Sequence, residues 1–181
     1  AVLYRYYNAR YSFFGHNRLA IRDLDVRSHQ PFSLDEELIL LYNGEIYNFA
    51  KVRALICDAV PEVVFQTSSD TELFYLIFKH KLFDVLDYVD GMYALVFYDN
   101  GDVFYCRDHL GIKPLYVFEQ REEIILSSEL KFSREAIRAL GLRYRGIDAG
   151  QLAPFFLQGF TYKDHTGFKD IKLVDRGMVY K

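Results

Sequence analysis

The residues best suited to chemistry come directly after an apolar segment near position 40. There, Leu-Tyr at 41–42 is followed by Asn43, Gly44 and Glu45. An Asn-Gly pair readily takes positive φ, and glycine leaves its own backbone N–H open to a ligand because it has no side chain. An amide, a bare N–H and a carboxylate therefore stand side by side, which suits the binding of a polar substrate. A tight turn between two apolar runs would also explain the Asn-Gly pair.

Three elements are expected to position this group. Residues 38–42 form a continuous apolar run of strand length, which predicts a strand that is covered on both faces. Residues 49–60 carry apolar side chains at helical spacing, and Pro61 ends the pattern. A second helix is predicted to begin within residues 68–72, where a serine or an aspartate can cap the first free N–H groups.

The rest of the chain reads as alternating short elements. The Asp99-Asn100-Gly101-Asp102 sequence predicts a hairpin between strands 92–98 and 103–107. The other predicted elements are two short strands or one strand bent at Gly15 over 11–22, a loop over 23–35, helices over 83–88, 133–140 and 151–157, and strands over 114–118, 123–127, 171–174 and 178–180.

The hydrophobic pattern of these strands indicates the architecture. Residues 92–98 are apolar on both faces, whereas an antiparallel sheet with one wet face would alternate. We therefore expect an α+β fold, an α/β/β/α sandwich of two mainly antiparallel sheets flanked by helices.

Composition and charge exclude several classes of function. A net charge of -3 with interspersed signs gives no electrostatic argument for nucleic acid or membrane as a partner. No apolar run reaches the roughly 20 residues of a membrane span. Cys57 and Cys106 are too few for a metal site or a disulfide framework, so we expect two buried thiols, no metal and a cytoplasmic location.

Five segments together resemble a known family, the class II glutamine amidotransferase domain of asparagine synthetases, which has an N-terminal cysteine nucleophile. The resemblance is strong over residues 11–133 and weaker to the end of the chain. It rests on the segments Gly-His-Asn-Arg-Leu-Ala-Ile-Arg-Asp at 15–23, Asn-Gly-Glu-Ile-Tyr-Asn at 43–48, Ser-Asp-Thr-Glu at 69–72, Asp-Gly-Met-Tyr-Ala at 90–94 and Arg-Asp-His-Leu-Gly-Ile-Lys-Pro-Leu-Tyr at 107–116.

The resemblance implies an Ntn-hydrolase-like fold, glutaminase activity and two parts of the chain. Residues 1–150 correspond to the amidotransferase domain, and residues 151–181 to the connection toward an absent ATP-dependent synthetase domain. It implies glutamine as substrate and no cofactor in this domain, with ATP and Mg expected only in the absent one. It does not indicate an oligomeric state.

The resemblance also assigns residues to the two charged ends of glutamine. Arg18 matches the arginine that pairs with the α-carboxylate, a task that suits its planar guanidinium. Asp70, with Glu45 nearby, matches the acid that holds the α-ammonium. Backbone groups around Leu19 and Arg22 match positions that line the pocket. Arg18 could instead be a surface ion-pair partner, and Asp70 could simply cap its helix.

The resemblance assigns the side-chain amide of glutamine to Asn43 and Gly44. The Asn43 side-chain NH₂ and the Gly44 backbone N–H match the oxyanion hole of the family, where preorganised donors stabilise the tetrahedral intermediate. His16, His29 and His109 have no nucleophile or ligand spacing around them, and we expect them to be structural. Residues 108–114 are expected to form a structural turn and a surface for the absent domain.

The beginning of the chain departs from the family. The family reaction needs a cysteine at residue one, whose thiolate attacks the amide while its own α-amine acts as base. This chain begins Ala-Val-Leu-Tyr, which predicts an N-terminally truncated domain without glutaminase activity. Cys57 and Cys106 lack such an amine. A catalytically dead glutamine-binding or scaffold domain is the alternative, and an unrelated binding domain is a second one.

Overall fold

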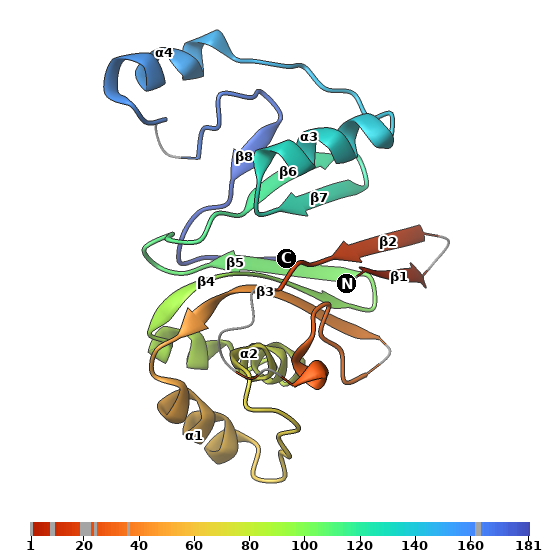
Figure 1. Cartoon of the computed structure of the whole chain (residues 1–181), viewed down its shortest axis with the longest axis vertical. Coiled ribbons are helices and arrows are strands. Elements are labelled where there is room, and N and C mark those ends of the chain that lie inside the picture. The colour runs from red at the N-terminus through yellow and green to blue at the C-terminus, as the bar shows by residue number, and fades with distance from the viewer. Residues whose placement is uncertain (1, 8–9, 19–22, 24, 36, 162–163) are drawn as a thin grey trace. The chain divides into compact units, whose positions relative to one another are not determined.

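The computed structural model describes residues 2–7, 10–18, 23, 25–35, 37–161 and 164–181. The chain divides into two compact units, one formed by Ala1–Tyr105 with Val179–Lys181 and the other by Cys106–Met178 (Figure 1). Helices and mainly antiparallel strands make up both units, as the α+β prediction requires. The residues predicted to bind glutamine all belong to the first unit.

A four-stranded sheet is the centre of the first unit. Antiparallel β3 and β4 pair along their full length, and β3 forms one edge of the sheet. Asn100 and Gly101 have positive φ and form the turn before β5, so the predicted hairpin is confirmed. In spatial order the strands are β3 (Leu38–Ile46), β4 (Gly91–Asp99), β5 (Asp102–Arg107) and β9 (Val179–Tyr180).

Three helical elements lie on one side of this sheet, and the sequence predicted all of them. They are α1 (Phe49–Ala59), α2 (Asp70–Lys79) and the 3-10 helix η2 (Phe83–Tyr88). Helix α2 lies between the sheet and α1, and its residues 70–78 are all buried (Figure 1). Because α2 is enclosed on every side, it offers a rigid platform for the edge strand β3.

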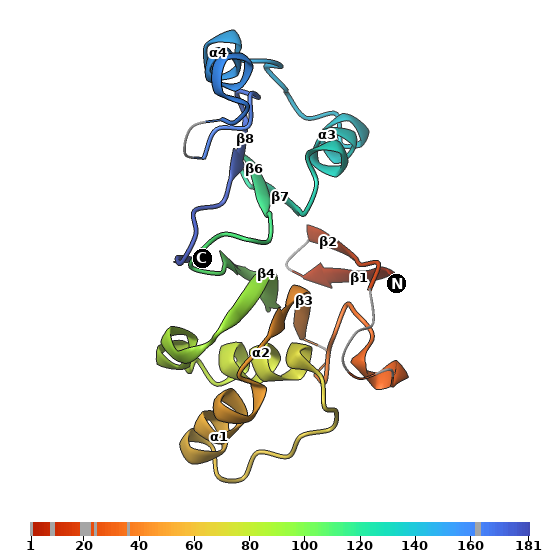
Figure 2. The ribbon, with the colours of Figure 1, turned by 60° about the vertical axis from the view of Figure 1, so that its left-hand side comes forward.

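A hairpin of β1 (Val2–Tyr7) and β2 (Arg10–Gly15) covers part of the opposite face of the sheet (Figure 2). Phe14 packs edge-on against Tyr98, with 5.3 Å between the ring centroids, and Ile39 completes this cluster. Strand β2 ends at Gly15 without positive φ, and residues 19–22 of the predicted strand lie outside the described residues.

The loop predicted over residues 23–35 contains the short 3-10 helix η1 (Val26–Ser28) and runs along the edge of β3. Phe32 and Leu40 exchange backbone hydrogen bonds of 2.8 Å. Further along, the Tyr75 hydroxyl donates to the Asp35 carboxylate at 2.9 Å. The loop is therefore fixed to both β3 and α2.

The second unit has its own sheet and core. Strand β6 (Tyr116–Gln120) pairs antiparallel with β7 (Glu123–Ser127) and with β8 (Ile171–Leu173). Helices α3 (Leu130–Ala139) and α4 (Ala149–Gln158) lie between β7 and β8 in the chain, and both begin before the predicted positions. The Asp148 carboxylate caps α4 by accepting from the Gly150 and Gln151 N–H groups, and this cap explains the earlier start of that helix.

Residues 108–114 form the structural turn that the sequence predicts, and the buried side chains of Arg107 and Asp108 hold it together. The Asp108 carboxylate accepts hydrogen bonds from the backbone N–H groups of residues 110, 112 and 113 at 3.0–3.2 Å. The Arg107 guanidinium donates to three backbone carbonyls, those of Gly111, Lys113 and Val174. The charged pair at the start of the motif therefore replaces water for six backbone groups.

Candidate functional site

The free edge of β3 determines how the candidate site is built. Backbone N–H groups along an antiparallel strand alternate between the two sides. Just beyond β3, the Tyr47 N–H donates to the Asp90 carbonyl on the β4 side at 2.8 Å. The Leu40 N–H donates at 2.8 Å to Phe32, which lies on the other side. N–H groups of even-numbered residues in β3 therefore point away from β4.

Side chains take two of these outward N–H groups. The Tyr42 N–H donates to Gln30 Oε1 at 2.5 Å, and the Ile46 N–H donates to Asp70 Oδ2 at 2.8 Å. Gly44 lies midway between them, and the described part of the chain provides no acceptor for its N–H. This N–H is therefore placed to donate a hydrogen bond to an oxygen atom of a ligand.

The alternative of a tight turn at Asn43-Gly44 is wrong, because both residues belong to β3 and neither has positive φ. Gly44 is required for a different reason. A Cβ atom at this position would lie 2.1 Å from the Met92 carbonyl oxygen and 2.7 Å from Tyr93 Cα. The two strands approach so closely here that only glycine fits, and the same absence of a side chain leaves the outer edge of β3 open.

The Asn43 and Glu45 side chains lie on the face of β3 opposite α2, because side chains alternate along a strand. Asn43 is exposed and Glu45 is half-buried. Between them, the Gly44 N–H points out of the sheet edge. The predicted group of amide, N–H and carboxylate is thus preserved, but on an extended strand rather than in a turn.

Tyr42 connects this strand to the acid on α2. Its ring is buried against Phe74, with 5.0 Å between the ring centroids. Burial raises the pKa of the Tyr42 phenol far above its usual value, and the negative charges of Asp70 and Glu45 raise it further. Both carboxylates therefore act on the same buried phenol, and the site has a negative region suited to an ammonium group.

Asp70 does not cap its helix, so that alternative is wrong. Ser69 is the capping residue, and its hydroxyl accepts from the Thr71 N–H at 3.1 Å. Asp70 is the first residue of α2 and is 5% exposed. Its carboxylate lies at the positive end of the helix dipole and holds the Ile46 N–H, which joins α2 to the end of β3.

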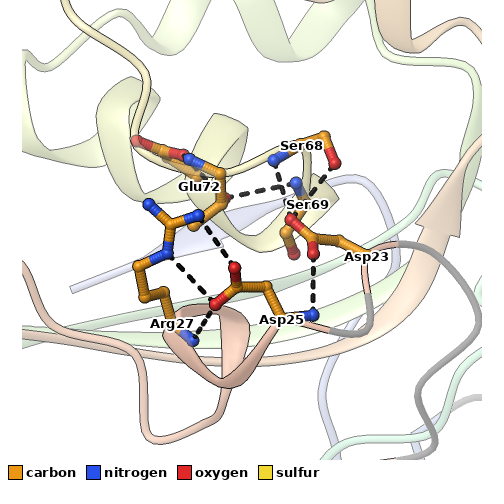
Figure 3. A network of polar contacts seen from close by, with 7 residues as sticks. Asp23, Asp25, Arg27, Ser68, Ser69 and Glu72 are labelled. Atoms are coloured by element: carbon orange, nitrogen blue, oxygen red, sulfur yellow. Dashed lines mark hydrogen bonds and ion pairs between the residues drawn. The ribbon is translucent and has the colours of Figure 1, made fainter.

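Arg18 is connected to the same region through Asp23, whose carboxylate bonds to Ser68 (Figure 3). Arg18 Nη2 donates to the Asp23 backbone carbonyl at 2.5 Å. The Asp23 carboxylate accepts from the Ser68 N–H at 2.8 Å and from the Ser68 hydroxyl at 3.1 Å, just before α2. Hydrogen bonds lower the pKa of the Asp23 carboxyl. The main one comes from the Asp25 N–H, and the Ser68 N–H and hydroxyl add to it. Leu19 and Arg22 lie outside the described residues.

The segment before α2 is held by Glu72, a residue of the 69–72 segment to which the sequence assigned no role. The buried Glu72 carboxylate accepts from the N–H groups of Gln66 and Thr67 at 2.8 and 2.7 Å. Ser69 and Glu72 have the spacing of a capping box, which is the signal that could have identified this role. Gln30, the other residue missed, had no comparable signal.

The two cysteines differ in their surroundings. Cys106 is buried, and burial with the neighbouring Asp108 charge raises the pKa of its thiol to about 12. Cys57 is exposed on α1, so its predicted burial is wrong. Among the described residues, no group of histidines, cysteines and carboxylates is arranged to hold a metal ion. Within the same residues no helix has the length and apolar character of a membrane span.

Known structures and sequences identify the fold and the family of this chain. The fold is similar to that of a glutamine phosphoribosylpyrophosphate amidotransferase from Bacillus subtilis complexed with ADP and GMP, with a TM-score of 0.54, 23% identity, and coverage of 72% of this chain and 30% of that one. This likeness confirms the predicted Ntn-hydrolase-like α+β fold. The family described as a glutamine amidotransferase domain matches residues 4–181. The chain therefore belongs to this family.

Several of its curated relatives are glutamine-hydrolysing asparagine synthetases. A putative asparagine synthetase of Methanocaldococcus jannaschii is 35% identical over 173 residues, which cover 86% of this chain and 32% of the relative. Asparagine synthetase B of Escherichia coli is 35% identical over 119 residues, with coverage of 64% and 21%. The chain thus spans about a third or less of the length of these relatives and corresponds to their amidotransferase domain.

Proposed function

We propose that this domain binds glutamine along the free edge of β3 and, in a complete enzyme, releases its amide nitrogen as ammonia. The observation that carries the proposal is the outward Gly44 N–H, fixed between two neighbouring N–H groups that already have acceptors. A preorganised donor of this kind stabilises the oxyanion of acyl transfer. The Asn43 amide is the second proposed donor.

The other contacts in this proposal follow from the charges of the substrate. Arg18, which is tied to the segment before α2, would pair with the α-carboxylate. Asp70 and Glu45, whose charges both reach the Tyr42 phenol, would hold the α-ammonium. Leu19 and Arg22 keep their proposed place as lining residues, which rests on the resemblance alone.

The 181-residue chain tested by itself should bind glutamine without hydrolysing it. The family mechanism requires a thiolate with its own α-amine as base. Cys57 lies within α1 and Cys106 within β5, and the pKa of about 12 keeps the Cys106 thiol protonated at neutral pH. Glutamine turnover above that of a no-enzyme control would contradict this expectation.

Isothermal titration calorimetry with glutamine tests the pocket. We expect Arg18→Ala to weaken binding by about tenfold or more, because charge-assisted hydrogen bonds contribute roughly 1.5–3 kcal/mol. Arg53→Ala is the matched control, since Arg53 is an exposed arginine that stacks on Phe65. An absence of heat with the unmodified chain, or equal affinities of the two variants, would contradict the proposal.

A change in the ligand separates the role of Asp70 from general damage. Asp70→Asn keeps an oxygen for the Ile46 N–H but removes the charge. It should weaken binding of glutamine and leave unchanged the weaker binding of 4-carbamoylbutanoate, which lacks the α-ammonium. Equal losses for both ligands would show that Asp70 does not contact the ammonium group.

The complete enzyme would add a synthetase domain that uses ATP and Mg. The amidotransferase domain itself needs no cofactor in this proposal. The length of the relatives supports such a partner. So do Phe156 and Leu157 of α4, which are 79% and 84% exposed on a helix with no buried residue. The functional boundary near residue 150 and the cytoplasmic location remain predictions. Hydroxyl-radical footprinting should show α4 protected in the full-length protein, and equal labelling of α4 in both proteins would contradict its role.

A further inference from the structure

Gln30 is a buried polar residue next to the candidate site that the resemblance does not assign. It is 4% exposed, and both ends of its amide are used. Oε1 accepts from the Tyr42 N–H at 2.5 Å, and Nε2 donates to Thr71 Oγ1 at 3.5 Å. A buried amide that is satisfied in this way fixes the groups on both sides of it.

The position of this bond along β3 gives it a functional meaning. Tyr42 is two residues before Gly44, and Ile46 is two residues after it, so each bonded N–H is about 7 Å from the Gly44 N–H. Gln30 holds the first of these groups and Asp70 holds the second. The direction of the Gly44 N–H therefore depends on a support on each side.

Both supports lead to the first turn of α2. Asp70 is the first residue of that helix, and Gln30 reaches it through the hydroxyl of Thr71. Since residues 70–78 are all buried, this turn has little freedom to move. Among the described residues no named strand pairs with this edge of β3, so the buried helix α2 is what aligns it.

We propose that Gln30 is a positioning residue, which orients the Gly44 N–H toward the side-chain oxygen of glutamine by holding the Tyr42 N–H against α2. This role rests on the proposed function, because it assumes that Gly44 is the oxyanion donor. It makes Asp70 a residue with two tasks, one on β3 and one on the substrate.

Amide hydrogen exchange tests the support without any ligand. Gln30→Met keeps the length of the side chain and removes both hydrogen bonds. We expect at least about tenfold faster exchange of the Tyr42 amide, with no change at the Leu95 amide, which lies opposite it in β4. Gln158→Met, at an exposed glutamine of α4, is the matched control and should change neither rate.

The effect on glutamine provides the functional readout. Gln30→Met should weaken glutamine binding by about tenfold. It should also reduce the change in NMR chemical shift that saturating glutamine causes at the Gly44 amide proton. A merely structural loss would leave that shift unchanged once the site is saturated. If Gln30→Met does not fold, Thr71→Val removes only the contact with α2 and should act in the same direction, with a smaller effect.

The results separate this inference from the proposed function. Normal Tyr42 exchange and normal glutamine affinity in both variants would overturn the role of Gln30 while the unmodified chain still binds glutamine. A failure of the unmodified chain to bind glutamine would overturn the proposed function, and the catalytic meaning of the support with it. Faster exchange with weaker binding supports both.

Discussion

Replacing Gly44 by alanine should destabilise the protein far more than a typical glycine-to-alanine change in a strand. The added Cβ would lie 2.1 Å from the Met92 carbonyl oxygen, well inside the roughly 3.5 Å at which non-bonded atoms attract each other. The obstructing atoms belong to the backbone of β4, so no change of rotamer relieves the overlap. Overpacking costs about 1–3 kcal/mol when side chains can adjust, and we expect about 3 kcal/mol or more here.

Urea unfolding followed by circular dichroism measures this loss directly. Gly15→Ala is the control, because its Cβ would meet only the edge of the Phe13 ring at 3.7 Å. It should change the free energy of unfolding by about 0.5 kcal/mol or less. A loss below about 1 kcal/mol for Gly44→Ala would refute the close approach of the strands. It would favour a turn with a freely placed glycine, which would also tolerate Gly44→Asn.

Three further predictions concern buried or titrating groups. Asp108→Asn should lower the free energy of unfolding by about 1–3 kcal/mol, because the carboxylate holds three backbone N–H groups. In the same urea titration, the surface change Asp102→Asn should cost less than about 0.5 kcal/mol. Only the Cys57 thiol should react with a thiol reagent in the native protein, whereas both thiols should react in denaturant, because Cys106 is buried. Rapid reaction of two thiols in the native protein would contradict that burial. Burial is the main cause that lowers the pKa of His16. The unfolded chain therefore takes up a proton near pH 6.5, before the folded chain does, and the free energy of unfolding should fall as the pH drops below that value. An equally steep fall in His16→Gln would count against this.

Local signals in the sequence predicted much of the fold correctly. The apolar period and Pro61 located α1, and the serine-rich segment before Asp70 located the start of α2. Asn100-Gly101 located the hairpin because both residues accept positive φ. These features depend on neighbours within a few residues, which is why the sequence alone is sufficient for them.

Features that depend on distant partners were missed or misread. The sequence offered a tight turn as one explanation of Gly44, whereas a glycine is required there by the backbone of β4, almost fifty positions later. Gln30 lay in an unremarkable loop, and its partners Tyr42 and Thr71 become visible only when the chain is folded. Cys57 was taken as buried, although α1 turns it to solvent.

The site residues were found through the resemblance, and the structure supplies the arrangement that the motifs could not. Asn43, Gly44 and Glu45 share one strand edge, and Asp70 is bonded to the end of the same strand. Arg18 is tied through Asp23 to the segment before α2. Their roles toward glutamine stay predictions, because each of these contacts is made within the protein.

A crystal structure of the 181-residue chain with bound glutamine would test the central claim most directly. The account predicts the side-chain oxygen of glutamine at about 3 Å from the Gly44 nitrogen, with the α-carboxylate at Arg18 and the α-ammonium at Asp70. Glutamine bound with its amide oxygen turned away from Gly44, or at another part of the molecule, would contradict it.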